Sequence, residues 1–135
     1  MGKPARLLDA SDIPALRQRR SEREQLVDAA RRWAARLDPE LEVRAVVVFG
    51  SVARGDFNVW SDLDVLVIAD HLPLRWSERL ALFGASRPPR LSPLGWTTAE
   101  LQRQLARGNP IAVEARDHGV VVAGSAEAAR LGGGP

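Results

Sequence analysis

The residues that point most directly to chemistry are two aspartates, Asp62 and Asp64, one residue apart at the start of an apolar run. Side chains alternate across a β-strand, so both carboxylates would face the same side of a sheet. Two neighbouring carboxylates need a positive group between them, and Mg²⁺ suits that place because it binds carboxylates together with substrate phosphates. The pair therefore predicts a metal site for a phosphate-bearing substrate.

A Gly-Ser pair upstream completes half of such a site. Gly50 and Ser51 follow an earlier apolar run, and ten residues separate Ser51 from Asp62. A turn at this point would offer backbone N–H groups and a hydroxyl to phosphates, and glycine permits the positive φ of a tight turn. Arg54 suits either a phosphate contact or an ion pair with Asp56. The segment thus predicts a site for a metal-bound nucleotide.

The elements that position these residues follow from apolar periodicity and helix caps. Two apolar runs, 43–49 and 63–69, predict the strands that carry the Gly-Ser pair and the aspartates. Ser21 with Glu24, and Thr97 with Glu100, form capping boxes that predict helix starts. Pro93 predicts an edge position or a bulge in a third strand. Further helices are expected over 75–85 and 111–117, the third strand over 90–96 and a last strand over 119–123.

Length and composition limit the class of protein. The 135 residues suffice for one domain, which we place at 21–124, between an N-terminal arm or helix (1–20) and a flexible tail (125–135). The sequence contains no apolar stretch near the roughly 20 residues of a membrane helix and no signal-like segment. It contains no cysteine, which excludes disulfides and thiolate chemistry. We therefore expect a cytoplasmic protein that does not bind membranes.

The net charge at pH 7 is only +2, but positively charged side chains are concentrated in one region of the sequence. Arginines crowd the first helical region at positions 17, 19, 20, 23, 31, 32 and 36. We interpret them as a solvated helix face paired with Glu22, Glu24 and Asp28, with a surface for nucleic acid or an acidic partner as the less favoured alternative. The tryptophans are interpreted as packing residues, with Trp60 as a partly buried anchor rather than a base-stacking platform.

Three stretches together resemble the signature of the polymerase-beta-like nucleotidyltransferases: Gly50-Ser51, Ala53-Arg54-Gly55 and Ser61-Asp62-Leu63-Asp64-Val65. The short chain is similar to the minimal nucleotidyltransferases in particular. The resemblance implies an α/β (α+β) fold with a small mixed or antiparallel sheet backed by helices. It also implies a nucleoside triphosphate near Gly50 and Ser51, and Mg²⁺ held by Asp62 and Asp64. The implied reaction is transfer of a nucleotidyl group to a protein or small-molecule hydroxyl.

One departure from the family pattern stands out. The family's enzymes usually carry a third carboxylate on the next core strand, and Ser92 falls near that position here. No Asp or Glu occurs between Glu78 and Glu100, so the whole third-strand region lacks a carboxylate. Three explanations stay open: another acid enters the site, a partner completes it, or nucleotide binds without efficient transfer. The candidate acids are Glu114, Asp117 and Asp70.

The missing carboxylate supports a second hypothesis from another functional class. Minimal nucleotidyltransferases are often paired with a small helical HEPN-type protein in toxin–antitoxin modules, and the resemblance extends that suggestion to this chain. The chain would then be a nucleotide-binding regulatory or antitoxin subunit with little catalysis. A homo-oligomer is also compatible with the sequence.

Overall fold

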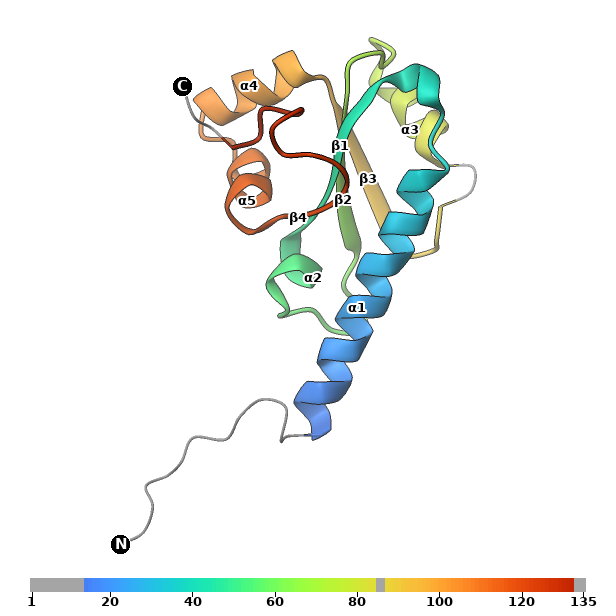
Figure 1. Ribbon diagram of the computed structural model, residues 1–135, viewed down its shortest axis with the longest axis vertical. Helices are drawn as coiled ribbons and strands as arrows, with labels where there is room; N and C mark the ends of the chain where they lie inside the picture. The colour runs from blue at the N-terminus through green and yellow to red at the C-terminus, as the bar shows by residue number, and fades with distance from the viewer. Residues whose placement is uncertain (1–13, 85–86, 133–135) are drawn as a thin grey trace, which may run out of the picture.

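A four-stranded sheet separates two layers of helices in the computed structural model, which describes residues 14–84 and 87–132 (Figure 1). The strands lie in the order β3-β2-β1-β4. Their bounds are β1 Val43–Phe49, β2 Leu63–Ala69, β3 Leu91–Trp96 and β4 Val120–Gly124. The helices are α1 Pro14–Ala35, α2 Gly50–Arg54, α3 Trp76–Gly84, α4 Thr98–Ala106 and α5 Pro110–His118, with a 3-10 turn, η2, at Pro39–Leu41.

The sheet is mixed, which is one of the two arrangements that the resemblance left open. Strand β1 pairs antiparallel with β2 and β4, whereas β2 pairs parallel with β3. Both predicted central strands, 43–49 and 63–69, are confirmed with the same bounds. Their continuous apolar runs reflect helices on both faces, because a strand covered on both sides buries every side chain. Pro93 lies in β3, an edge strand that pairs only with β2, where a missing N–H costs least.

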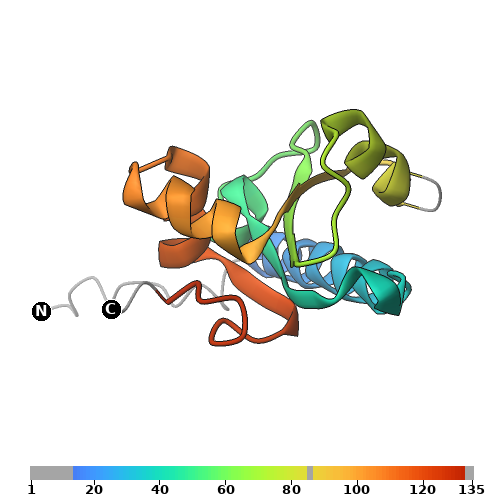
Figure 2. The ribbon, with the colours of Figure 1, turned by 90° about the horizontal axis from the view of Figure 1, so that it is seen from above.

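Two apolar clusters, one on each face of the sheet, hold the layers together. Figure 2 shows the helices that lie over the two faces. On one face α1 and α3 cover the sheet, and the rings of Trp33 and Phe83 meet edge to face with centroids 6.0 Å apart. On the other face α4 and α5 contribute Leu101 and Ala112. None of the helices over the described residues is long and apolar enough to cross a membrane.

The chain ends depart from expectation where the structure describes them. Helix α1 already includes Pro14, so Ser21 lies inside it and not at its N-cap. Proline fits the first turn of a helix and arginine is a good helix former, so the helix begins before the capping box. Residues 125–132, expected in a flexible tail, instead bury Ala129 and Leu131 against the α4–α5 layer. The rest of the predicted arm (1–13) and tail (133–135) lies outside the described residues.

Helix α3 packs differently from the predicted amphipathic pattern. Phe83 is buried, but Trp76 is 49% exposed and Leu80 is also exposed, so the prediction of Trp76 as a packing residue is wrong. The position facing the core is taken by Arg79, which is only 4% exposed. An arginine buried to this extent must find partners for its guanidinium group.

The guanidinium of Arg79 joins three elements. It donates to the carbonyl of Pro73 at 2.6 Å, to the carbonyl of Gly95 at 3.0 Å and to Glu100 Oε1 at 2.6 Å. Glu100 is also part of the predicted capping box of α4, which is confirmed: Glu100 N donates to Thr97 Oγ1 and Thr97 N to Glu100 Oε1. Burial alone would raise the pKa of Glu100, but hydrogen bonds from Arg79 and Thr97 lower it overall.

Replacing Arg79 tests this junction. Arg79→Ala removes the guanidinium partner of two carbonyls and of the partly buried Glu100 carboxylate, which keeps only its bond from Thr97 N, and we expect a loss of about 3 kcal/mol in the free energy of unfolding. Urea denaturation measures it. Arg75→Ala is the matched control, because Arg75 is exposed immediately before the same helix and should change stability by less than about 0.5 kcal/mol. Equal losses in the two variants would contradict the assignment.

Candidate active site

The sheet brings the predicted site residues together where strand β1 ends and strand β2 begins. Phe49 at the end of β1 pairs with Asp64 at the start of β2, and Asp64 pairs with Ser92 in β3. Gly50 follows Phe49 directly, so the Gly-Ser pair and the aspartates meet. Leu66, two residues along β2 from Asp64, belongs to the α4–α5 cluster. Alternation therefore turns Asp64 towards that face as well.

Gly50 lies directly beside the carboxylate of Asp64, with no room for a side chain between them. Its φ is +76°, in the left-handed region that glycine adopts without strain. A Cβ at this position would lie 2.5 Å from Asp64 Oδ2, so any side chain would collide with the carboxylate. The preceding residue, Phe49, is the N-cap of α2 and has no side chain that could accept its first N–H groups. The Gly-Ser turn and Asp64 therefore form one structural unit.

The two aspartates oppose each other electrostatically. Asp62 is exposed, whereas Asp64 is partly buried. Burial raises the pKa of the Asp64 carboxyl, the charge of Asp62 raises it further, and Arg54 acts in the opposite direction. A cation between the carboxylates would remove this repulsion. Across the described ranges no three acidic or histidine side chains converge on a metal site, so Asp62 and Asp64 are two candidate donors without a third beside them. This set fits Mg²⁺, which typically adds substrate phosphates and water to one or two carboxylates.

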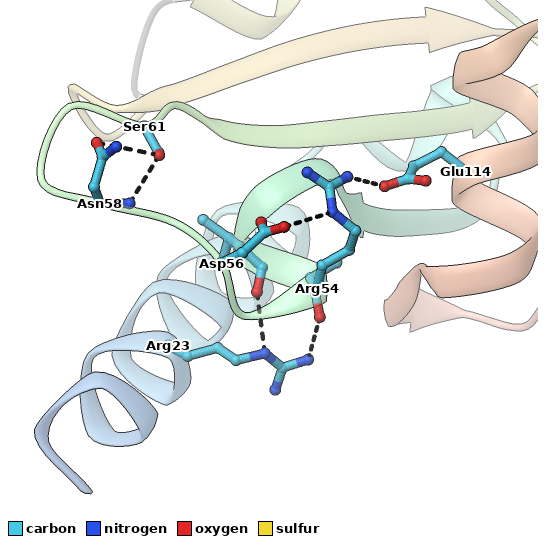
Figure 3. Close-up of polar contacts among 8 residues, drawn as sticks. Arg23, Arg54, Asp56, Asn58, Ser61 and Glu114 are labelled. Carbon is cyan, nitrogen blue, oxygen red and sulfur yellow. Dashed lines mark hydrogen bonds and ion pairs between the residues drawn. The ribbon is translucent and has the colours of Figure 1, made fainter. Parts of the chain in front are cut away.

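Arg54, at the end of α2, lies between two acids (Figure 3). Its Nε donates to Asp56 Oδ2 at 3.1 Å, and its Nη1 pairs with Glu114 Oε1 of α5. Of the two roles that the sequence left open for Arg54, the ion pair with Asp56 is thus present. Glu114 also lines a shallow hollow of about 240 Å³ beside Gly50, together with Phe49, Pro110 and Ile111.

The three candidate replacements for the missing carboxylate lie in different places. Asp70 is at the far end of β2, where it accepts hydrogen bonds from Arg44 at 2.7 Å and from Thr98 N at 3.2 Å. Asp117 pairs with its neighbour Arg116 at 2.9 Å. Only Glu114, of these three, borders the Gly50 turn. The strand register places Ser92 opposite Asp64, so β3 brings a hydroxyl where the family pattern has an acid.

The loop between α2 and β2 presents Trp60 to solvent. The expectation of a partly buried anchor is wrong, because Trp60 is 88% exposed and Phe57 fills the core instead. The turn is closed by Asn58 N donating to Ser61 Oγ at 2.9 Å (Figure 3). Arg90 donates to the carbonyls of Ser61 and Asn58 and fixes the turn against the sheet. An exposed indole is therefore held two residues before Asp62.

The position of α2 depends on a contact that sequence reasoning missed. Arg23 of α1 donates from Nε to the Val52 carbonyl at 3.0 Å and from Nη2 to the Ala53 carbonyl at 2.8 Å (Figure 3). These bonds satisfy carbonyls in the last turn of α2, as a cation near a helix C-terminus does. About thirty residues separate the partners, and no local pattern signals such a pair.

The match with known proteins decides the family. A family model described as a nucleotidyltransferase domain matches residues 30–123, which include the whole site from Gly50 to Glu114. This chain belongs to that family. A crystal structure of a protein from Sulfolobus solfataricus, assigned as a nucleotidyltransferase, matches with a TM-score of 0.58 and 14% identity, covering 87% of this chain and 89% of that one. No match is found among the curated proteins.

Membership confirms the polymerase-beta-like nucleotidyltransferase fold that the signature residues implied. At 14% identity the solved structure supports the fold alone. The family supports nucleotidyl transfer as the general activity of the domain.

Two glycines with the same backbone requirement test the contact between the turn and Asp64. Gly50 and Gly55 both have positive φ, +76° and +88°, but a Cβ at Gly55 would meet no atom within 4 Å. Both Gly→Ala changes should cost about 1–2 kcal/mol of stability from the left-handed backbone. Only Gly50→Ala should also displace the carboxylate and abolish binding of Mg²⁺–nucleotide. Urea denaturation and isothermal titration measure the two effects, and identical binding by both variants would contradict the assigned contact.

Proposed function

We propose that this domain is a Mg²⁺-dependent nucleotidyltransferase that uses a nucleoside triphosphate and a hydroxyl of a protein or small molecule as acceptor. One observation carries the proposal: the Asp64 carboxylate lies against the left-handed Gly50, at the start of α2. This contact supports the proposal, because a carboxylate and a glycine turn so close together suit the binding of a single metal–triphosphate group.

The roles of the residues follow from that geometry. The N–H groups of the Gly50–Ser51 turn and the Ser51 hydroxyl bind the phosphates. Asp62 and Asp64 hold the metal, which when bound neutralises the charge that develops on the phosphate oxygens. Arg54 pairs with Glu114, which borders Gly50, and its charge acts to lower the pKa of Asp64. It can exchange its carboxylate partners for a phosphate oxygen.

Glu114 is the residue best placed to accept the proton of the acceptor hydroxyl. Ser92 opposite Asp64 is a weak base, whereas Glu114 borders Gly50 from α5. Its carboxylate is held by Arg54, and a shift of Arg54 to the phosphates would free it. Nucleotide binding and the release of a general base would then be coupled through one arginine.

Loss of either aspartate tests the metal site. Asp62→Ala and Asp64→Ala should each weaken Mg²⁺-dependent binding of a nucleoside triphosphate, by at least about tenfold if one charge-assisted metal contact is lost. Titration of ATP, GTP, CTP and UTP with and without Mg²⁺ measures this effect and the base preference. Asp28→Ala, on the exposed surface of α1, is the control. Unchanged affinity in both site variants would remove the assignment.

Glu114→Gln separates proton transfer from binding. This isosteric change keeps a hydrogen bond to Arg54 but removes the base, so we expect the transfer rate to fall by about 10²–10⁴ while nucleotide affinity changes little. Single-turnover kinetics with labelled triphosphate give the rate and the affinity separately. A fall in affinity with the rate per bound nucleotide unchanged would show that Glu114 only orients Arg54.

A second candidate function is favoured by the carboxylate-free β3. The chain would bind nucleotide as the regulatory or antitoxin subunit of a two-component system with a small helical HEPN-type protein. The neighbouring reading frame provides the partner to test. Incubation of both proteins with labelled triphosphate distinguishes the two functions: label on the partner supports transfer, and a tight complex without label supports regulation.

A further inference from the structure

A second hollow, a groove lined by several arginines, lies at the opposite end of α2 from Gly50, between α2 and the N-terminal half of α1. It has a volume of about 450 Å³. Its lining residues include four arginines and one carboxylate: Arg19, Arg20, Arg23, Arg54 and Glu24. A five-residue helix spans only about 7.5 Å, so the groove adjoins the proposed triphosphate site without being part of it.

Carboxylates of the described residues do not balance the charge of this arginine groove. Arg54 is neutralised by Asp56 and Glu114. The other three arginines form no ion pair with a carboxylate among the described residues. The sequence interpretation paired the arginines of this region with Glu22, Glu24 and Asp28. The described part of α1 has the pair of Arg31 with Asp28, which lies beyond the groove, and no ion pair with Glu22 or Glu24. A cationic surplus therefore faces the hollow.

Two of these arginines are held in place before any ligand arrives. Arg23 is fixed by its bonds to the Val52 and Ala53 carbonyls, and the guanidinium carbon of Arg19 lies 5.8 Å from the ring centroid of the buried Phe57. Cation–π contact uses none of the N–H donors of Arg19, and a guanidinium has five. Side chains already ordered lose little entropy on binding, which favours affinity.

We propose that the arginine groove is a second anion site, which binds the phosphate chain of an inorganic polyphosphate or a nucleotide. Guanidinium groups bind phosphate oxygens in paired hydrogen bonds, and three uncompensated arginines against one glutamate suit a ligand with several negative charges. The site needs neither metal nor Asp62 and Asp64. It therefore goes beyond the proposed transfer function and does not depend on it.

Binding of inorganic tripolyphosphate without Mg²⁺, in EDTA and low salt, tests the groove by isothermal titration. The double variant Arg19→Ala/Arg20→Ala should bind at least about tenfold more weakly than the wild type, because charge-assisted hydrogen bonds to phosphate are lost. Arg103→Ala/Arg107→Ala removes the same charge from the exposed surface of α4 and should bind as the wild type does. Equal weakening in both double variants, or no binding by the wild type, would overturn the proposal.

Two further arms separate the ligands and the sites. ATP without Mg²⁺ shows whether a nucleoside strengthens binding: equal affinity supports a polyphosphate ligand, and tighter binding lost in Arg19→Ala/Arg20→Ala supports a nucleotide. Asp62→Asn/Asp64→Asn should retain tripolyphosphate binding in EDTA although it loses Mg²⁺-dependent nucleotide binding. Loss of both in this variant would overturn the second site while the proposed transfer function remains.

Discussion

The antiparallel register of β1 on β2, with Phe49 opposite Asp64, is the constraint on which the rest of the site depends. A slip of one residue would turn Asp64 to the other face of the sheet, away from α5. The register is held by apolar side chains buried on both faces, in two separate clusters. Packing on both faces of the sheet thus fixes the position of the Asp64 carboxylate against Gly50.

The site draws on both helical layers as well as on the sheet. From one side, Arg23 of α1 fixes the last carbonyls of α2, and from the other, Glu114 of α5 holds Arg54. Strand β3 contributes Ser92 in the place where a further acid would be expected. In the role proposed for Glu114, helix α5 would supply the carboxylate that β3 lacks, within an unchanged nucleotidyltransferase fold.

Sequence reasoning predicted the features that depend on interactions between nearby residues and missed those that depend on tertiary contacts. The two central strands and the Thr97–Glu100 capping box follow from apolar runs and from side-chain hydrogen bonding within a few residues, whereas Ser92 was placed by the family resemblance. The start of α1 was misplaced because helix formers precede Ser21. The exposure of Trp60 and Trp76 was missed because Phe57 and Arg79 take the inward positions. No sequence pattern could select Glu114, since its contact joins residues sixty apart.

The raised pKa of Asp64 means that the folded chain holds a proton there more tightly than the unfolded chain does. As pH rises through the ordinary carboxyl range, the contribution of this one group to the stability of the native state therefore falls, and it stays unfavourable at neutral pH. A ligand that brings positive charge to the aspartates removes this unfavourable contribution, in addition to the stabilisation that any native-state ligand confers by mass action. Resistance to unfolding, and with it survival against proteases in the cell, would then follow the supply of the ligand.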